Sequence, residues 1–147
     1  MSSLVLVTGI TGKQGGAIAN ALLEAGHRVR GLSRNPQSDR ARALAARGIE
    51  VVRGDFTDPA SLVAAATGVD AVFAMSTPFE GGIEAETAQG IALVDAARQA
   101  GVAHFVYTSV ANADRQTGIP HFDSKFAVEQ YLRQADIPWT VVAPVYF

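Results

Sequence analysis

The sequence predicts an α/β fold in which helices cover both faces of a doubly wound parallel sheet, giving three layers. Short apolar, β-branched runs alternate along the chain with longer stretches of helical periodicity. Several of the short runs are continuously apolar, which is typical of parallel strands buried on both faces. A glycine-rich turn joins the first strand to the first helix. Together these observations favour about six strands in the order 3-2-1-4-5-6.

Each element has a local signal. The predicted strands are the apolar runs at 4–8, 28–32, 50–53, 71–74, 104–108 and 139–143. The predicted helices are the amphipathic stretches at 13–25, 39–47, 59–67, 84–100 and 122–135. Asp58 would cap the third helix, because Pro59 suits the first helical position. Glycines that would end four of the helices occur at 26, 48, 68 and 101.

Composition narrows the class of protein. With 147 residues, 48% hydrophobic and 18% charged, the chain is expected to form one soluble domain over residues 1–147, in the cytoplasm. No apolar run approaches the roughly 20 residues that span a bilayer. The net charge of −2, without a basic run, argues against direct nucleic-acid binding. There is no cysteine and the three histidines are far apart, so we expect no metal site.

The turn after the first strand is the most informative segment. Residues 8–16 read TGITGKQGG, between the run Leu4–Val7 and a helical stretch. Glycines in such a turn let the backbone approach a pyrophosphate, which the N–H groups of the following helix then bind. The spacing is Gly-x-x-Gly-x-x-Gly, which departs from the Gly-x-Gly-x-x-Gly fingerprint. We interpret the turn as a dinucleotide site; the alternative is a turn whose glycines serve geometry alone.

The end of the second strand indicates which dinucleotide. NAD-binding proteins place an acidic residue here for the ribose 2′-hydroxyl, whereas this chain has Ser33 and Arg34. A guanidinium can hold a 2′-phosphate through two charge-assisted hydrogen bonds, and a serine hydroxyl can add a third. The sequence therefore predicts NADP(H) rather than NAD(H), the alternative being that Arg34 is an exposed loop residue.

Other polar residues follow the remaining strands. Asp55 could accept a hydrogen bond from an adenine amino group while Phe56 packs on the ring, or Asp55 could only order its turn. Ser76 and Thr77 could line the nicotinamide side, and Pro144 could turn the backbone beneath the ring or simply end its strand.

The last predicted helix begins with two candidate catalytic residues. His121 and Lys125 are four residues apart, so they share a helix face. An ammonium there can bond the nicotinamide ribose hydroxyls, and a neutral histidine can donate a proton. The alternatives are a solvated lysine and a histidine that caps the helix.

Taken together, these residues resemble the atypical short-chain dehydrogenases/reductases, and within them the NmrA-like family, which has a Rossmann-like fold. The similarity rests on residues 7–16, 33–35, 54–56 and 121–125, continues into 129–132 and 137–140, and covers essentially the whole chain. The resemblance implies a pyrophosphate held by Gly9, Thr11, Gly12, Gln14 and Gly15. It implies a 2′-phosphate at Ser33 and Arg34, adenine at Asp55 and Phe56, nicotinamide at Ser76 and Thr77, and the nicotinamide ribose at Lys125.

Two departures from that family's relatives bear on function. Typical superfamily members use Tyr-x-x-x-Lys, with the tyrosine protonating a carbonyl oxygen, whereas His121 stands in the tyrosine position here. Relatives also continue past the sixth strand into a substrate-binding region, so we expect residues 1–147 to be the nucleotide-binding part of a longer protein.

The resemblance leaves two functions open. The missing tyrosine favours a redox sensor that binds NADP(H) and alters a protein partner. The alternative is an NADPH-dependent oxidoreductase that reduces a quinone or another small electrophile, because aromatisation of a reduced quinone lowers the need for a protein acid.

Overall fold

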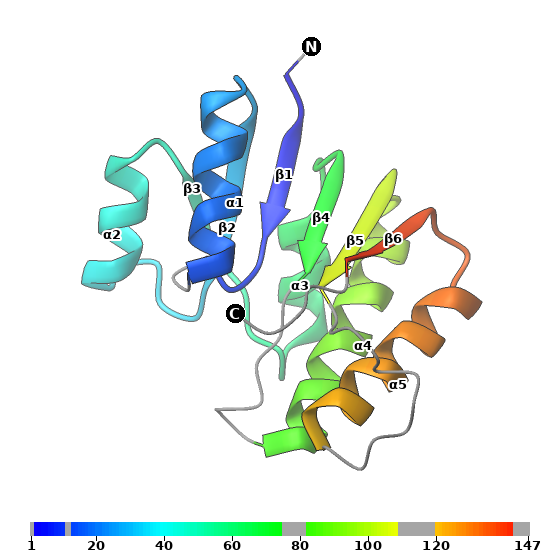
Figure 1. The fold of residues 1–147 in the computed structure, drawn as a ribbon. Coiled ribbons are helices and arrows are strands. Elements are labelled where there is room, and N and C mark those ends of the chain that lie inside the picture. Colours follow the sequence, from blue (N-terminus) through cyan, green and yellow to red (C-terminus); the bar gives the residue numbers. More distant parts are fainter. Residues whose placement is uncertain (1, 11–12, 75–81, 109–119, 143–147) are drawn as a thin grey trace.

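The computed structural model describes residues 2–10, 13–74, 82–108 and 120–142, with side chains given except at 13–14, 82–86 and 120–125. Strands and helices alternate along this chain (Figure 1). All six predicted strands and all five predicted helices are confirmed, with several ends shifted by one or two residues. Their bounds are β1 Leu4–Val7, α1 Lys13–Glu24, β2 Arg28–Ser33, α2 Asp39–Ala46, β3 Glu50–Arg53, α3 Pro59–Ala66, β4 Ala71–Ala74, α4 Gly82–Ala100, β5 His104–Thr108, α5 Pro120–Gln134 and β6 Trp139–Val142.

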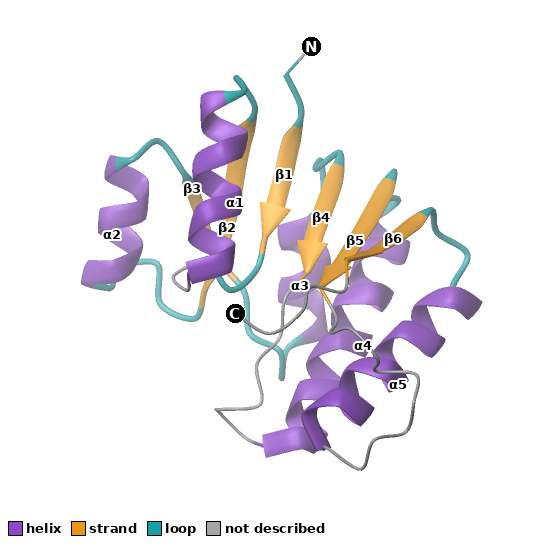
Figure 2. Ribbon diagram, viewed as in Figure 1, coloured by secondary structure: helices purple, strands orange, loops and turns teal. Residues whose placement is uncertain are grey.

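The six strands form one parallel sheet in the order β3-β2-β1-β4-β5-β6, as predicted. All the strand arrows in Figure 2 therefore point to the same edge. The order reverses between β1 and β4, since the chain proceeds from β1 outward to β3 and then returns to the other side of β1. Ligands of such sheets bind beyond the carboxyl ends at this point of reversal.

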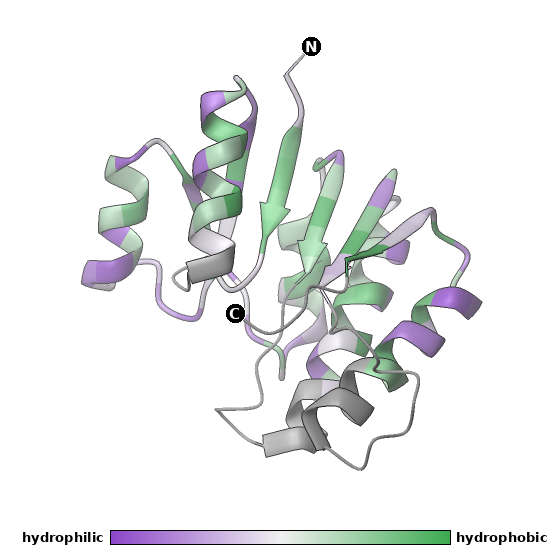
Figure 3. Cartoon of the chain, in the orientation of Figure 1, coloured by the Kyte–Doolittle hydropathy of each residue, from purple (hydrophilic) through white to green (hydrophobic). Residues whose placement is uncertain are grey.

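Two apolar cores, one on each face of the sheet, confirm the three layers. Val7, Ile10 and Val29 pack with Ala19 of α1 and Leu44 of α2. On the other face, side chains of β1, β4 and β5 pack against α3, α4 and α5. The central strands β1 and β4 are accordingly hydrophobic along their whole length in Figure 3.

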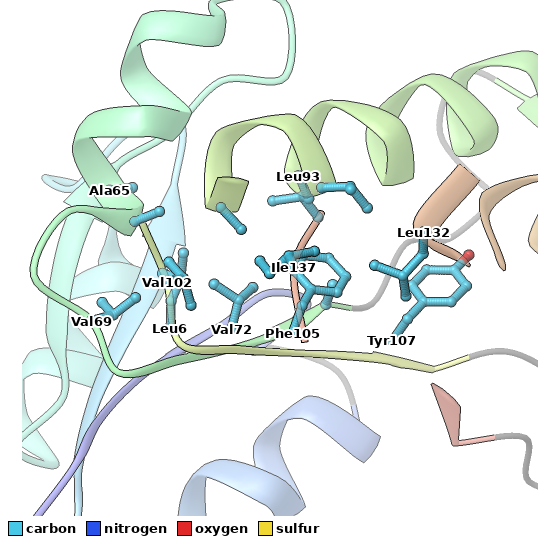
Figure 4. Packing of buried hydrophobic residues seen from close by; sticks show 14 of the residues in the cluster. Leu6, Ala65, Val69, Val72, Leu93, Val102, Phe105, Tyr107, Leu132 and Ile137 are labelled. Carbon is cyan, nitrogen blue, oxygen red and sulfur yellow. The ribbon is translucent and has the colours of Figure 1, made fainter. Parts of the chain in front are cut away.

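The larger core is densest around β5. Phe105 and Tyr107 are fully buried, and in Figure 4 the Tyr107 ring lies beside Leu132 of α5 and the Phe105 ring beside Ile137, both beneath α4. Burying an aromatic or leucine side chain contributes about 1.5–3 kcal/mol, so this cluster is a main source of stability for the half of the sheet beyond β1. Among the described residues, no helix has the length and apolarity required to cross a bilayer.

The helix ends follow the sequence signals closely. The four predicted end glycines all have positive φ, at 87° for Gly26, 88° for Gly48, 84° for Gly68 and 73° for Gly101. Pro59 occupies the start of α3 as predicted, but the Asp58 side chain makes no capping hydrogen bond. It accepts instead from Arg53, 3.2 Å away at the end of β3.

A half-buried arginine, Arg30, joins three elements. The Arg30 Nε on β2 donates to Glu50 of β3 at 2.9 Å. Its Nη1 donates at 2.8 Å to the carbonyl oxygens of Ala65 and Thr67 at the end of α3. A cation at a helix C-terminus satisfies carbonyls that have no partner within the helix. Arg30 therefore joins the C-terminal end of α3 to the sheet.

Candidate functional site

The turns that follow β1, β2 and β3 lie along the carboxyl edge of the sheet. Strand β1 is held to β4 just beyond its end, because the Thr8 N–H donates to the Phe73 carbonyl at 3.0 Å. This pair marks the point where the strand order reverses, so the predicted site residues of the first three turns lie where the fold brings ligands.

The turn after β1 lies in very close contact with the first turn of α1. Gly9 has φ 64°, a conformation that favours glycine. A Cβ on Gly15 would lie 2.2 Å from the Gly9 carbonyl oxygen and 3.0 Å from the Ile10 Cα. Ile10 is buried and anchors the turn, and a Cβ on Gly31 of β2 would come within 3.2 Å of its Cδ1. The helix can approach the turn this closely only because residue 15 has no side chain.

The turn after β2 is held by its own short side chains. The Ser33 Oγ accepts from the Asn35 N–H at 3.1 Å, and Asn35 Oδ1 accepts from the Gln37 N–H at 3.0 Å. Ser38 then caps α2 by accepting from the Ala41 N–H at 3.2 Å. Because the Ser33 hydroxyl is the acceptor in the bond with Asn35, its O–H can still donate to a ligand. Arg34 is exposed between these residues.

The turn after β3 is held by several hydrogen bonds of its own. Asp55 Oδ1 accepts from the Thr57 hydroxyl at 2.7 Å and from the Thr57 N–H at 2.9 Å. These two bonds hold the pKa of the Asp55 carboxyl below its ordinary value; burial opposes them, and the charges of Arg53 and Arg34 add smaller lowering effects. Asp55 therefore does order its turn, and Arg34 is near enough to act on its carboxylate.

Phe56 follows Asp55 at the same edge and is half-buried, packed on the core beneath α3 and α4. One side of this ring is therefore anchored in the protein. Its position beside the Asp55 carboxylate is compatible with a planar base packing there, although the turn itself accounts for both residues structurally.

A polar group that the sequence did not single out lies at the end of β5. The Thr108 hydroxyl is buried, with the residue only 5% exposed, and no hydrogen-bond partner for it is found among the described residues. Buried hydroxyls nearly always have a partner, so this one suits a ligand or water at the same edge. A threonine after an apolar run gives no signal of this in the sequence.

The remaining predicted residues cannot be placed in detail. Gln14, His121 and Lys125 fall in the first turns of α1 and α5, but their side chains lie outside the described part. Thr11, Gly12, Ser76, Thr77 and Pro144 lie outside the described residues. No cluster of three metal-binding side chains occurs in the described portion.

The described residues fit a phosphate-bearing nucleotide by two tests. The close contact between Gly9 and Gly15 brings the backbone of the turn against the first turn of α1, and the N-terminus of a helix after a glycine turn is a site that binds anions. A guanidinium and a carboxylate, Arg34 and Asp55, follow the next two strands. These groups offer a cation for a phosphate and an acceptor for an amino group.

Comparisons with known proteins agree with this geometry. A family model described as the NmrA-like family matches residues 1–147. An NmrA-like family domain-containing protein of Dictyostelium discoideum is 34% identical over 159 residues, covering 100% of this chain and 52% of that protein. The NAD(P)H azoreductase of Xenophilus azovorans is 33% identical over 144 residues, covering 98% of the chain and 48% of the enzyme. The chain thus spans about half the length of these relatives.

Solved structures give the same picture. The Citrobacter sp. triphenylmethane reductase complexed with NADP(H) has a TM-score of 0.83 and 33% identity, over 96% of this chain and 48% of that one. The Escherichia coli NADPH-dependent quinone oxidoreductase complexed with NADPH has a TM-score of 0.82 and 30% identity, over 95% and 48%. NmrA, a negative transcriptional regulator in complex with NADP, has a TM-score of 0.80 and 26% identity, over 97% and 45%.

Proposed function

The chain belongs to the NmrA-like family. We propose that it binds NADP(H) at the carboxyl edge of its sheet and forms the nucleotide-binding part of an NADPH-dependent reductase. The observation that carries the proposal is the contact of Gly15 with the Gly9 carbonyl, which brings the N-terminus of α1 against the glycine turn after β1, the arrangement that binds a pyrophosphate. We also propose that residues 1–147 are the nucleotide-binding part of a longer protein whose remaining part binds the acceptor.

In this proposal each turn has a separate task. The backbone between Gly9 and Gly15, with Gln14, holds the pyrophosphate at the N-terminus of α1. Ser33 and Arg34 hold the 2′-phosphate, because a hydroxyl and a guanidinium both donate to phosphate oxygens. Asp55 and Phe56 receive the adenine. The nicotinamide side is assigned to Ser76, Thr77, Lys125 and Pro144.

Names of related proteins favour reduction over sensing. The relatives include an azoreductase and the solved structures include a triphenylmethane reductase and a quinone oxidoreductase, each at least 30% identical. The regulator NmrA is 26% identical. The three named reductases suggest flat, conjugated acceptors, and we assign this chain the same broad class.

The chemistry of such acceptors suits the residues present. NADPH, when bound, supplies a hydride. The protein then has to orient the nucleotide, exclude water and provide a proton. Lys125 holds the ribose next to the nicotinamide, and His121, four residues earlier, is the proton donor where one is needed. For a quinone, a tyrosine is dispensable because the ring becomes aromatic on reduction, which stabilises the reduced oxygens.

An activity assay on the full protein tests the proposal. Loss of NADPH absorbance would be followed with a quinone, an azo dye and a triphenylmethane dye as acceptors. We expect turnover in the wild type, and a fall of about 10²–10⁴-fold in Lys125→Ala if the lysine positions the nucleotide for transfer. The control is Arg133→Ala, which also removes a positive charge from α5. Arg133 lies in the last turn of the helix, over the Trp139 ring.

Two outcomes would contradict parts of this account. Tight NADPH binding without turnover on any acceptor would favour the sensor, in which the empty and bound states differ in affinity for a protein partner. Unchanged turnover in His121→Ala, together with loss in Lys125→Ala, would remove the histidine from proton transfer and leave the reductase standing.

A further inference from the structure

The Ser61 hydroxyl is bonded to both ends of the turn that follows β3. Its Oγ accepts from the Asp55 N–H at 3.0 Å and donates to the Asp58 carbonyl at 2.7 Å. A longer contact of 3.3 Å reaches the Asp55 carbonyl, so the single hydroxyl proton goes to the nearer oxygen. Ser61 lies in the first turn of α3, six residues from Asp55, and is half-buried.

The rest of the turn gives this hydroxyl particular importance. The Asp58 N–H donates to the Asp55 carbonyl at 2.9 Å, which closes the turn from inside. Thr57 binds the Asp55 carboxylate, but both residues belong to the turn and move with it. Arg53 reaches Asp58 only through a pair that is about half exposed, which contributes little. Ser61 is the described side chain that joins Asp55 to helix α3.

We propose that Ser61 is a positioning residue for the adenine end of the nucleotide. This inference rests on the proposed NADP(H) site, in which Asp55 and Phe56 receive the base. Removing the hydroxyl leaves the Asp55 N–H without its acceptor, so Asp55 loses its side-chain link to α3, while the Ser61 N–H still donates to the Asp58 carbonyl at 3.0 Å. The Asp55 carboxylate then no longer has a fixed place from which to accept from the adenine amino group. Ser61 itself touches no ligand.

A base-altered nucleotide separates this role from general stability. The reduced 6-desamino analogue of NADPH, which has purine in place of adenine, carries hydrogen in place of the 6-amino group, so that edge of its base offers the Asp55 carboxylate no donor. The wild-type protein should bind NADPH more tightly than the analogue. In Ser61→Ala we expect NADPH to bind about fivefold more weakly, the factor for one hydrogen bond, while the analogue changes by less than about twofold.

Two further variants make the experiment decisive. Ser61→Thr keeps a hydroxyl at the same place and should restore the preference for adenine. Thr67→Ala removes a hydroxyl from the other end of α3, where Thr67 Oγ1 donates to the Val63 carbonyl at 2.7 Å. It should lower stability without changing the ratio of the two affinities. Thermal unfolding of all four proteins shows whether each one folds.

The possible results lead to different conclusions. Equal weakening of both nucleotides in Ser61→Ala, or no weakening, would overturn the positioning role while leaving the NADP(H) site in place. Equal binding of both nucleotides by the wild type would overturn it as well, because Asp55 would not read the base. Failure of the wild type to bind either nucleotide would refute the proposed function itself.

Discussion

Gly15 and Gly16 are neighbours in the first turns of α1, yet only one of them lacks room for a side chain. A Cβ on Gly15 would lie 2.2 Å from the backbone oxygen of Gly9, whereas a Cβ on Gly16 would lie 3.5 Å from the Ile10 carbonyl oxygen. The first distance requires the backbone to move, while the second is an ordinary van der Waals contact.

Opposite effects on stability are therefore expected from one added methyl group. Gly15→Ala should cost about 1–3 kcal/mol of unfolding free energy through overpacking and should weaken NADPH binding. Gly16→Ala should be neutral or raise stability by up to about 1 kcal/mol, because alanine favours the helix. Urea unfolding measures the change in unfolding free energy of both variants, and titration measures their affinity for NADPH. Equal changes in the two variants would contradict the close contact of Gly15 with Gly9.

The sequence predicts the backbone conformation of some residues well, but it does not predict the hydrogen-bond partners of others. The end glycines of the helices and the places of the strands follow from local composition and period, which act over a few residues, and the strand order follows from the common topology of doubly wound sheets. The bonds of Ser61 to Asp55 and Asp58 depend on how the turn folds back on α3, and the isolation of Thr108 depends on strands far apart in the chain. The sequence left Asp55 with two possible roles for the same reason.

At the scale of elements, α4 and α5 pack closely at two places. A Cβ on Gly90 would come within 2.6 Å of the Val128 Cγ2, so the glycine lets the helices approach. Further along, the Tyr131 hydroxyl donates to the Asp95 carboxylate in a short hydrogen bond, and Arg98 lies 3.5 Å from the same carboxylate oxygen. The bond to Asp95 raises the pKa of Tyr131, with some contribution from burial.

This contact predicts how stability changes at alkaline pH. The folded protein keeps the Tyr131 proton at pH values where the unfolded chain, with an ordinary tyrosine pKa near 10, loses it. The stabilisation is therefore complete below about pH 10 and disappears as pH rises through the raised pKa of the folded state. Tyr131→Phe should be less stable than wild type by about 0.5–1.5 kcal/mol at pH 8, and the difference should shrink above pH 10.

Chemical unfolding of both proteins at a series of pH values gives the difference directly, because other groups titrate alike in each. A difference that stays constant from pH 8 to strongly alkaline pH would show that the tyrosine hydroxyl does not protect its proton in the folded state. A matched comparison is Arg98→Ala, which removes the neighbouring charge from Asp95 and leaves the hydroxyl in place.

Over the whole molecule, positive charge is unevenly distributed. Seven of the twelve lysines and arginines lie between residues 28 and 53 with only two acids among them, although the chain as a whole carries −2. This segment contains β2, α2 and β3, which form one side of the molecule in Figure 1. A positive region of this kind attracts an anionic nucleotide before any contact is made, which raises the association rate at low salt. The seven basic residues between 28 and 53 are Arg28, Arg30, Arg34, Arg40, Arg42, Arg47 and Arg53.

Binding at the carboxyl edge should stabilise the entire domain, since a ligand of the native state alone shifts the unfolding equilibrium by mass action. NADPH at one hundred times its dissociation constant adds about 2.7 kcal/mol. Arg34→Ala should lose a charge-assisted contact worth about 1.5–3 kcal/mol with NADPH and little with NADH, which lacks the 2′-phosphate. At one fixed concentration of nucleotide, the variant should show nearly equal melting shifts with the two cofactors.

Arg42→Ala is the control, because Arg42 is an exposed arginine further along α2 that shares the charge of the region but not the turn. It should slow association at low salt and still keep the larger melting shift with NADPH. If Arg34→Ala also keeps that larger shift, then the 2′-phosphate is not bound at the end of β2, and selectivity for NADPH has to come from the general charge of the region. Measurement of both variants at low and high salt separates these two cases, since only the general attraction is screened.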